Sequence, residues 1–280
     1  YFAQTGHSHF AATPTATFAL NPRSSVKMTP GGEWSPHRVA CMSNEKPLTG
    51  QVALVTGASR GIGLAIARHL GQMGARMAMC ARNEKTLAQA ADSLRREGIE
   101  ALAIVADVTQ LIQVQSLVKG VEKTFGPIHI LVNNAGTGVF GPFQQLTEAD
   151  WDTVLDTNLK AVFLVSQAVV PGMIRLRAGH IINISSLAGQ NTFPGGSIYC
   201  ASKWGLQGLT GCMAEDLRGY GIRVSSICPG TVDTDFSPHA GKDPAKMLRP
   251  EDVAHAVGML VTQAPQSFIS EVHLRPTQKP

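Results

Sequence analysis

Residues 48–280 alternate short apolar runs with longer stretches in which apolar residues recur at helical spacing. This alternation restricts the fold more than any other feature, because strands separated by helices form parallel βαβ units. Parallel strands are covered by helices on both faces, so continuous apolar runs are expected for them. The pattern therefore predicts an α/β fold with one doubly wound domain over residues 48–280, in which a seven-stranded parallel sheet has helices on both faces.

Glycine, proline and polar residues mark most boundaries between the predicted elements. The predicted strands are residues 52–56, 76–81, 101–106, 128–133, 180–185, 222–227 and 268–274. The predicted helices are residues 61–73, 84–97, 110–125, 147–171, 198–219 and 251–262. Ligands bind at the carboxyl ends of the strands in such sheets, so functional residues are expected just after strands.

Composition excludes several classes of protein. The chain has 24 basic and 20 acidic residues, a net charge of +4, and no concentrated basic patch, so we expect no nucleic-acid partner. Hydrophobic residues make up 44% and charged residues 16%, which is typical of a packed globular protein. No apolar run approaches the roughly 18 residues that cross a bilayer, so we expect no membrane partner.

The cysteines indicate a reducing compartment. They form no C-x-x-C pair and no Cys/His cluster in the sequence, and they are Cys41, Cys80, Cys200, Cys212 and Cys228. An odd number of scattered cysteines is typical of free thiols. We therefore expect a cytoplasmic protein with no disulfide framework, and neither a zinc site nor any other metal site.

Residues 1–47 differ in composition from the rest of the chain. Ala, Thr, Ser, Pro and His dominate there, and Glu33 is the only acid among the first 44 residues. We expect a disordered N-terminal tail. Acid-poor, Ser/Thr-rich segments also serve as organelle-targeting leaders, and Met28 or Met42 is an alternative start of the protein.

A glycine-rich turn joins the first predicted strand to the first predicted helix. Its residues are Gly57-Ala58-Ser59-Arg60-Gly61-Ile62-Gly63, with the spacing G-x-x-x-G-x-G. Glycines let backbone N–H groups and the helix N-terminus approach a pyrophosphate, because no Cβ stands in the way. In this strand–turn–helix context the turn favours phosphate binding over a merely structural role.

The same turn also matches G-x-S-x-G, the nucleophile elbow of serine hydrolases. Ser59 would then be the nucleophile, with Asp233 and either His255 or His273 as its partners. This alternative is weaker, since the elbow would lie on the first strand and Gly63 would have no role.

Two arginines predict which dinucleotide binds. An acid after the second strand binds a ribose 2′-OH, whereas an arginine there accommodates a 2′-phosphate. Arg82 ends the second predicted strand, and Arg60 adds a second cation from the glycine turn. Two guanidinium groups favour a dianionic phosphate, so we expect NADP(H) in preference to NAD(H). Glu84 leaves NAD(H) open, although an acid also suits the start of the following helix.

Polar residues in the second half of the chain suggest proton transfer. Tyr199 and Lys203 are one helical turn apart and share a face. An adjacent ammonium stabilises a phenolate and moves its pKa from about 10 toward neutrality. The alternative is a surface lysine beside a half-buried tyrosine. Asn158 interrupts the apolar stripe of the predicted 147–171 helix, either as a core amide bonded to backbone or as a functional group.

These motifs resemble, in order and spacing, the short-chain dehydrogenase/reductase family over residues 48–280. The resemblance rests on Thr56-Gly57-x-x-x-Gly61-x-Gly63, Asn133-Asn134-Ala135-Gly136, Asn158, Ser186 and Tyr199-x-x-x-Lys203, with Asp107-Val108 and Pro229-Gly230-Thr231-Val232-Asp233-Thr234. It implies a Rossmann-type fold and a homodimer or homotetramer that pairs the helices over 147–171 and 198–219.

The resemblance also assigns roles. Tyr199 would be the acid/base, and Ser186 would hydrogen-bond the substrate oxygen. Lys203 would hold ribose hydroxyls and lower the tyrosine pKa, while Asn158 would anchor a proton-relay water. The implied cofactor residues are Gly57, Ser59, Arg60, Gly61, Ile62, Gly63, Arg82, Asp107, Val108, Asn134, Gly136, Tyr199, Lys203, Pro229, Gly230, Val232 and Thr234. The expected substrate pocket comprises Ser186, Leu187, Phe193 and Phe236.

The chemistry expected from such a site is reversible hydride transfer between nicotinamide and a carbonyl or secondary alcohol, without a metal. Within the family the chain resembles NADPH-dependent carbonyl reductases, including 3-oxoacyl-[acyl-carrier-protein] reductases. Residues 235–249, which would fold over the substrate, form a short segment, and residues 271–276 lack an Asp-Gly-Gly ending. We therefore expect a small ketone, aldehyde or hydroxy acid. An acyl-carrier substrate and a non-catalytic NADP(H) sensor are the alternatives.

Overall fold

The computed structural model describes residues 46–236 and 241–280. These residues belong to one compact unit that spans residues 44–280. The predicted N-terminal tail lies almost wholly outside the described residues, as does Cys41.

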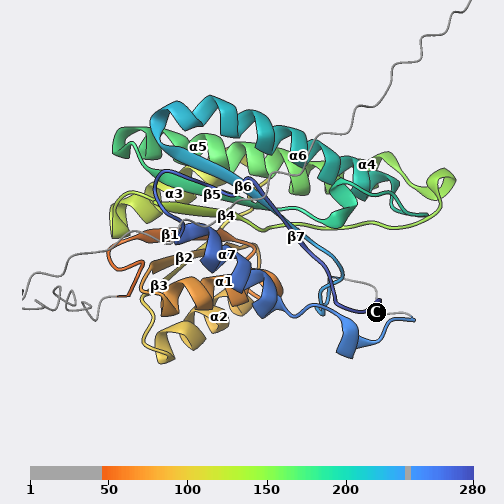
Figure 1. Cartoon of the computed structure of the whole chain (residues 1–280), viewed down its shortest axis with the longest axis horizontal. Helices are drawn as coiled ribbons and strands as arrows, with labels where there is room; N and C mark the ends of the chain where they lie inside the picture. Colours follow the sequence, from red (N-terminus) through yellow and green to blue (C-terminus); the bar gives the residue numbers. More distant parts are fainter. Residues whose placement is uncertain (1–45, 237–240) are drawn as a thin grey trace, which may run out of the picture. The chain divides into compact units, whose positions relative to one another are not determined.

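A seven-stranded sheet forms the centre of this unit (Figure 1). Its strand order is β3-β2-β1-β4-β5-β6-β7, and every neighbouring pair is parallel, which confirms the predicted sheet. The strands are β1 Val52–Thr56, β2 Arg76–Ala81, β3 Ala101–Val105, β4 Ile130–Asn133, β5 Gly179–Ile184, β6 Ile222–Pro229 and β7 Glu271–Leu274. The order reverses between β1 and β4, and a ligand crevice is expected outside the carboxyl ends of these two strands.

Helices cover both faces of the sheet, as the alternation predicts (Figure 1). One layer contains α1 Gly61–Gln72, α2 Glu84–Arg96 and α7 Pro250–Val261. The other contains α3 Leu111–Phe125, α4 Glu148–Leu155, α5 Ala161–Leu176 and α6 Ser197–Leu217. Short helical turns are η1 Phe143–Gln145, η3 Leu187–Gly189, η4 Arg218–Tyr220 and η5 Pro244–Lys246.

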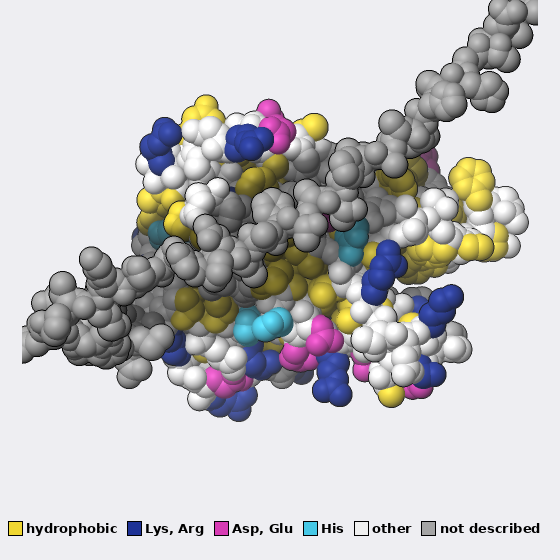
Figure 2. All heavy atoms as spheres, viewed as in Figure 1, with side chains coloured by type: hydrophobic (Ala, Val, Ile, Leu, Met, Phe, Trp, Pro, Cys, Tyr) yellow, Lys and Arg dark blue, Asp and Glu magenta, His cyan; other side chains and the backbone are white. Residues whose placement is uncertain are grey.

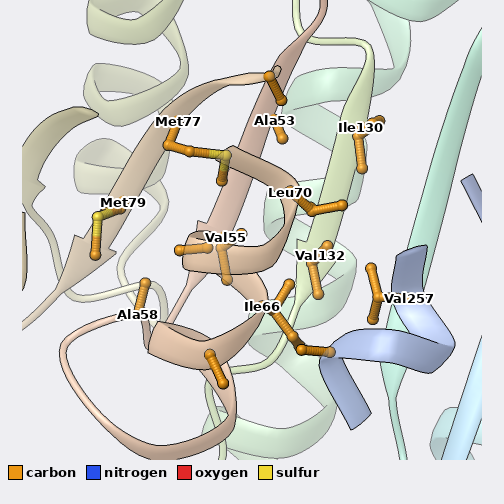
Figure 3. Close-up of a cluster of buried hydrophobic side chains, with 14 of the residues drawn as sticks. Ala53, Val55, Ala58, Ile66, Leu70, Met77, Met79, Ile130, Val132 and Val257 are labelled. Carbon is orange, nitrogen blue, oxygen red and sulfur yellow. The ribbon is translucent and has the colours of Figure 1, made fainter. Parts of the chain in front are cut away.

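Alternating side chains of β1 point to the two helical layers and belong to two separate hydrophobic clusters. Ala53 and Val55 pack on one side against Ile66 of α1, in the cluster shown in Figure 3. Val52 and Leu54 face the opposite cluster. All five side chains are fully buried, and each large one contributes roughly 1.5–3 kcal/mol of burial free energy. The first strand and the glycine turn that follows it are therefore held from both faces.

Charged side chains of both signs lie interspersed on the face shown in Figure 2, over the layer that contains α1, α2 and α7. This distribution agrees with the small net charge of +4.

Most element boundaries lie within two residues of the predictions, and two larger differences have structural reasons. The last strand begins at Glu271 rather than at residue 268, because this edge strand pairs only with the last four residues of β6. The predicted helix over 147–171 contains a π-helical segment, η2 Asp156–Lys160, and then continues through Pro171 to Leu176. π-Helical turns are frequent at functional sites.

The prediction that no segment is apolar enough to cross a membrane is wrong for one helical run. Within the described residues, Glu148–Leu176 has the length and hydropathy of a membrane span, and 39% of its most apolar window is buried. The run has the interior contacts of a core helix, since it packs against α3, α6 and strands β4 and β5. It nevertheless leaves an apolar outer face, which includes Trp151 and Phe163.

Candidate functional site

A cavity of about 1390 Å³ lies at the carboxyl ends of the strands, next to the point where the strand order reverses. It brings together nearly all of the predicted site residues. Those that line it are Gly57, Ser59, Arg60, Gly61, Ile62, Arg82, Asp107, Val108, Asn134, Gly136, Ser186, Leu187, Phe193, Tyr199, Lys203, Pro229, Gly230, Val232, Thr234 and Phe236. Gly63 and Asn158 lie behind this lining and are buried.

Close backbone packing explains the glycines of the turn. Gly57 and Gly61 have left-handed φ angles of +64° and +54°. A Cβ on Gly57 would lie 2.9 Å from the Ala135 Cα, and one on Gly63 would lie 2.4 Å from the Gly57 carbonyl oxygen. The loop after β4 and the first turn of α1 can therefore approach the turn only because these side chains are absent. This arrangement leaves the N-terminus of α1 open to the cavity, where a phosphate group fits.

Thr56 and Asn134 hold the turn against the end of β4. The Thr56 hydroxyl accepts hydrogen bonds of 3.0 Å from the backbone N–H groups of Asn134 and Ala135. The Asn134 amide donates to the carbonyl oxygens of Thr56 and Gly57, at 3.0 and 3.2 Å. The resemblance places Asn134 near a ribose, and in this structure its amide donors fix the glycine turn.

The two arginines that the sequence singled out lie at the same cavity. Arg60 is exposed and forms an ion pair of 2.9 Å with Asp235. Arg82 is exposed at the end of β2, and Glu84 begins α2, as its suitability for a helix start predicts. Asp107 accepts hydrogen bonds from the backbone and hydroxyl of Thr109, which fixes the loop after β3.

Ser186 and Tyr199 face the same part of the cavity from different elements. Ser186 follows β5 and caps η3, where its hydroxyl accepts a hydrogen bond of 3.1 Å from the Ala188 N–H. Tyr199 lies in the first turn of α6, and its ring packs 5.3 Å from that of Phe140 and 5.9 Å from that of Phe236. Burial raises the pKa of Tyr199 to about 12, although a hydrogen bond with Ser186 acts in the opposite direction. The phenol is therefore protonated at neutral pH and can donate a proton.

Lys203 is buried one turn beyond Tyr199. Its Nζ donates a hydrogen bond of 2.9 Å to the Ile184 carbonyl oxygen and lies 5.8 Å from the centre of the Tyr199 ring. Burial lowers the pKa of Lys203 to about 8. The sequence predicts that this ammonium lowers the tyrosine pKa, yet the pKa of Tyr199 is raised here. The reason is that burial acts strongly on both groups while the ammonium is directed to a backbone carbonyl.

Asn158 organises the backbone around Tyr199 from the π-helical segment. Its Oδ1 accepts from the Thr137 N–H at 2.8 Å, and its Nδ2 donates to the Thr137 carbonyl at 2.8 Å and to the Ser202 hydroxyl at 3.0 Å. The Ser202 hydroxyl in turn donates to the Tyr199 carbonyl at 2.7 Å. The Asn158 side chain is therefore a buried amide that bonds to backbone, the first of the two alternatives drawn from the sequence. It joins the loop after β4 to α6.

Sequence reasoning missed two parts of the cavity wall. Phe140 lies on the loop after β4, and residues 275–280 continue from the carboxyl end of β7. Both segments follow strands, so the rule that ligands bind at carboxyl ends applies to them as well. Their sequences lack a motif that would have drawn attention to them.

The two histidines of the hydrolase alternative contact residues other than Ser59 in the described part of the chain. The His255 ring lies beside that of His69, with 6.1 Å between ring centres. His273 lies 3.2 Å from Glu271 and contacts Gln190. Both histidines thus have other neighbours, and the geometry gives no support to Ser59 as an acyl-transfer nucleophile.

Comparison with known sequences gives a consistent set of relatives. The family model described as short chain dehydrogenase matches residues 51–245. An uncharacterized oxidoreductase of Staphylococcus aureus (strain USA300) is 34% identical over 229 residues, which cover 82% of this chain and 98% of the relative. An uncharacterized oxidoreductase of Staphylococcus epidermidis is 35% identical over 226 residues, which cover 81% and 97%.

Solved structures with the same fold contain nicotinamide dinucleotides. A metagenomic short-chain oxidoreductase in complex with NADP has 44% identity and a TM-score of 0.74, covering 83% of this chain and 100% of that chain. A variant of actinorhodin polyketide ketoreductase with NADPH has 33% identity and a TM-score of 0.76, covering 81% and 96%. An alcohol dehydrogenase from the archaeon Thermococcus sibiricus, complexed with 5-hydroxy-NADP, has 31% identity and a TM-score of 0.76, covering 82% and 98%.

Proposed function

Because the chain belongs to the short-chain dehydrogenase family, we propose that it is an NADP(H)-dependent oxidoreductase that interconverts a carbonyl and a secondary alcohol. One observation supports this proposal above the others. Ser186, which follows β5, and Tyr199 and Lys203 of α6 line the same cavity as the glycine turn after β1. The proton-transfer group and the dinucleotide site are therefore adjacent.

The dinucleotide would lie across the ends of β1 and β4. The N-terminus of α1 and the backbone of Gly61 and Ile62 would hold its pyrophosphate. Asp107 and Val108 would border the adenine, and Val232 with Thr234 would border the nicotinamide carboxamide. When bound, NADPH supplies the hydride.

The protein groups supply the proton and orient the carbonyl. Tyr199 would donate its phenolic proton to the developing alkoxide, and Ser186 would hydrogen-bond the same oxygen. Lys203 would hold ribose hydroxyls and stabilise the phenolate left after proton transfer. Asn158, which is linked to the Tyr199 carbonyl through the Ser202 hydroxyl, would keep the acid in place and anchor a relay water.

Two cationic side chains support a preference for NADP(H) over NAD(H). Arg60 and Arg82 both line the cavity, and both are exposed and able to reorient. Charge-assisted hydrogen bonds from guanidinium groups are roughly twice as strong as neutral ones, which favours a 2′-phosphate. The three solved structures are complexes with NADP, NADPH or an NADP analogue, in agreement with this preference.

The substrate would be a small ketone, aldehyde or hydroxy acid. Leu187, Phe193 and Phe236 line the cavity with Phe140, so the wall beside Tyr199 is largely apolar and aromatic. The similarity to a polyketide ketoreductase is compatible with a ketone. An acyl-carrier-bound 3-oxoacyl group is the more specific alternative.

The outer apolar surface of the long helices supports a homodimer or homotetramer. Trp151 of α4, Phe163 of α5 and Trp204 of α6 are about half exposed. Contiguous apolar side chains on a surface are typical of protein interfaces. Pairing of these helices between subunits would bury the three side chains.

The bacterial relatives favour the cytoplasm as the location of this protein.

A cofactor titration followed by a substrate screen tests the proposal. The purified protein is titrated with NADPH and NADH while nicotinamide fluorescence is recorded, and small carbonyl compounds and 3-oxoacyl thioesters are then added. We expect tighter NADPH binding and oxidation of NADPH by small carbonyls. Cofactor binding without turnover would indicate a sensor, and turnover of long acyl thioesters alone would indicate the acyl-carrier alternative.

Arg82→Ala tests the origin of the cofactor preference. Loss of one charge-assisted contact should weaken NADPH binding roughly 10- to 100-fold and leave NADH binding unchanged. Arg96→Ala, at the exposed end of α2, is the matched control. An equal loss for both cofactors would contradict the assignment of Arg82.

A further inference from the structure

Three potential metal ligands meet at the edge of the sheet, outside the cavity lining. Cys228 lies on β6, directly opposite His273 on β7, and Ser226 lies opposite Glu271 in the same parallel ladder. Residues two apart on a strand point to the same face. Cys228, Glu271 and His273 therefore project together, toward Gln190 after η3 and Gln207 of α6.

The separations between these ligand atoms suit one small cation. The Glu271 Oε1 lies 3.4 Å from the Cys228 Sγ and 3.2 Å from the His273 Nε2. All three ligand atoms lie within 4.8 Å of one another. Zinc–ligand bonds of about 2.0–2.3 Å in a tetrahedral site place neighbouring ligands about 3.3–3.7 Å apart. Two of the three separations are already close to that range.

We propose that Cys228, Glu271 and His273 form a site for one Zn²⁺ ion, which ties the edge strand β7 to β6. One thiolate, one carboxylate and one imidazole are ligands that Zn²⁺ accepts in proteins. The fourth position would be filled by water. None of its three ligands lines the cavity, so the ion would lie apart from the candidate functional site.

The surroundings supply partners for such an ion. The amide oxygen of Gln207 is buried without a hydrogen-bond partner in the described part of the chain, while its nitrogen contacts the Glu271 Oε1. Water bound to the metal would donate to this oxygen. The Gln190 Nε2 lies 2.6 Å from the same Oε1 and 2.7 Å from the His273 Nε2. Metal binding at this nitrogen would therefore displace the Gln190 amide from the imidazole, while its contact with Glu271 could persist.

Binding changes the protonation of Cys228. The Cys228 thiol is buried, and its sulfur lies 3.4 Å from the Glu271 Oε1. Coordination forms a Zn–S bond, breaks the S–H bond and releases one proton to solvent. The Glu271 and His273 side chains are 34% and 39% exposed, which gives the ion a route from solvent.

The sequence analysis missed this cluster, because Cys228 is far along the chain from Glu271 and His273. Metal sites are found in a sequence by short ligand spacings, whereas here the ladder between two strands brings the ligands together. The sequence analysis expects no Cys/His cluster, whereas in the structure the side chains of Cys228 and His273 lie in one cluster with Glu271.

Cobalt titration of the full chain tests the site spectroscopically. Co²⁺ bound to a thiolate has an intense near-ultraviolet charge-transfer band, and a tetrahedral site adds visible d–d bands. We expect both bands, saturating at about one Co²⁺ per chain, and Zn²⁺ should abolish them. Cys228→Ser should remove the charge-transfer band, and Cys212→Ser, which alters an exposed thiol, should retain it. A band that is absent, or unchanged in Cys228→Ser, would overturn the proposal.

Thermal unfolding provides the second measurement, which does not depend on removing a buried residue. Zn²⁺ at 100-fold over its Kd should raise the Tm by several degrees, because it binds only the folded chain. The partly exposed ligand variant His273→Ala should fold and lose at least half of this shift. An equal Zn²⁺-induced shift in wild type and His273→Ala would place the metal elsewhere and refute the site.

Discussion

The Nη1 of Arg60 lies 2.9 Å from a carboxylate oxygen of Asp235, across the glycine turn from the loop that follows β6. Both side chains are largely exposed, and such pairs contribute only about 0–1 kcal/mol. The pair therefore holds Arg60 weakly. In the proposed function, a 2′-phosphate competes with Asp235 for this guanidinium group.

Removal of the Asp235 charge should therefore tighten NADPH binding. Asp235→Asn leaves Arg60 free for the phosphate, and the expected gain is roughly two- to fivefold in Kd, with NADH binding unchanged. Nicotinamide fluorescence titrations measure both constants. Glu97→Gln, which removes the partner of Arg68 in another surface ion pair, is the control. Weaker NADPH binding by Asp235→Asn would contradict this account of the pair.

A second prediction concerns the packing of the glycine turn. Gly63→Ala places a Cβ against the Gly57 carbonyl, so it should destabilise the protein by roughly 1–3 kcal/mol and weaken cofactor binding. Gly211→Ala on α6 meets nothing within 4 Å and should stabilise the helix by up to about 1 kcal/mol. Urea denaturation compares the two variants. Equal stabilities would show that the turn tolerates a side chain.

Burial of the Lys203 ammonium should lower the stability of the protein at neutral pH. Its pKa of about 8 in the folded state lies below the ordinary value of 10.5, so folding disfavours the charged form. This penalty is fully present below pH 8 and disappears as the pH rises toward 10.5. Lys203→Met should therefore be roughly 1–3 kcal/mol more stable at pH 7 and close to wild type at pH 10, although inactive.

Thermal unfolding of Lys203→Met at the two pH values measures this difference. Lys119→Met, at an exposed position on α3, should have little effect at either pH. A Lys203→Met variant that is less stable than wild type at pH 7 would mean that the hydrogen bond to Ile184 outweighs the burial penalty.

Assembly is tested on the outer face of α5. Phe163 is 47% exposed, and a charge there should prevent burial of this face between subunits. Phe163→Asp is expected to shift the protein to a smaller species in sedimentation velocity. Ile112→Asp alters an even more exposed apolar side chain, on α3, and should leave the assembly unchanged. The proposal fails if Phe163→Asp retains the wild-type sedimentation coefficient.

Local signals in the sequence were sufficient to predict the sheet and most of the residues that line the cavity. Buried parallel strands are continuous apolar runs, and Gly57, Gly61 and Gly63 mark a turn in which a Cβ would meet neighbouring backbone or a positive φ angle. Tyr199 and Lys203 share a helix, so their proximity followed from their spacing. Each of these features depends on residues close together in the chain.

Features that depend on long-range packing could not be predicted. The sequence does not reveal that burial, rather than the Lys203 charge, dominates the pKa of Tyr199. Nor does it show that the Asn158 amide bonds the Thr137 backbone, or that the β6–β7 ladder joins Cys228 to His273. The desolvation of these groups and their partners are set by elements that fold together from distant parts of the chain.

The most direct test of the central claim is the rate of NADPH oxidation by Tyr199→Phe with the best carbonyl substrate of the wild-type enzyme. The account predicts that kcat falls by roughly 10²- to 10⁴-fold while NADPH binding is unchanged, because only the proton donor is lost. Tyr220→Phe, which alters an exposed tyrosine, should retain the wild-type rate. A Tyr199→Phe enzyme that turns over at the wild-type rate would contradict the assignment of Tyr199 as the acid.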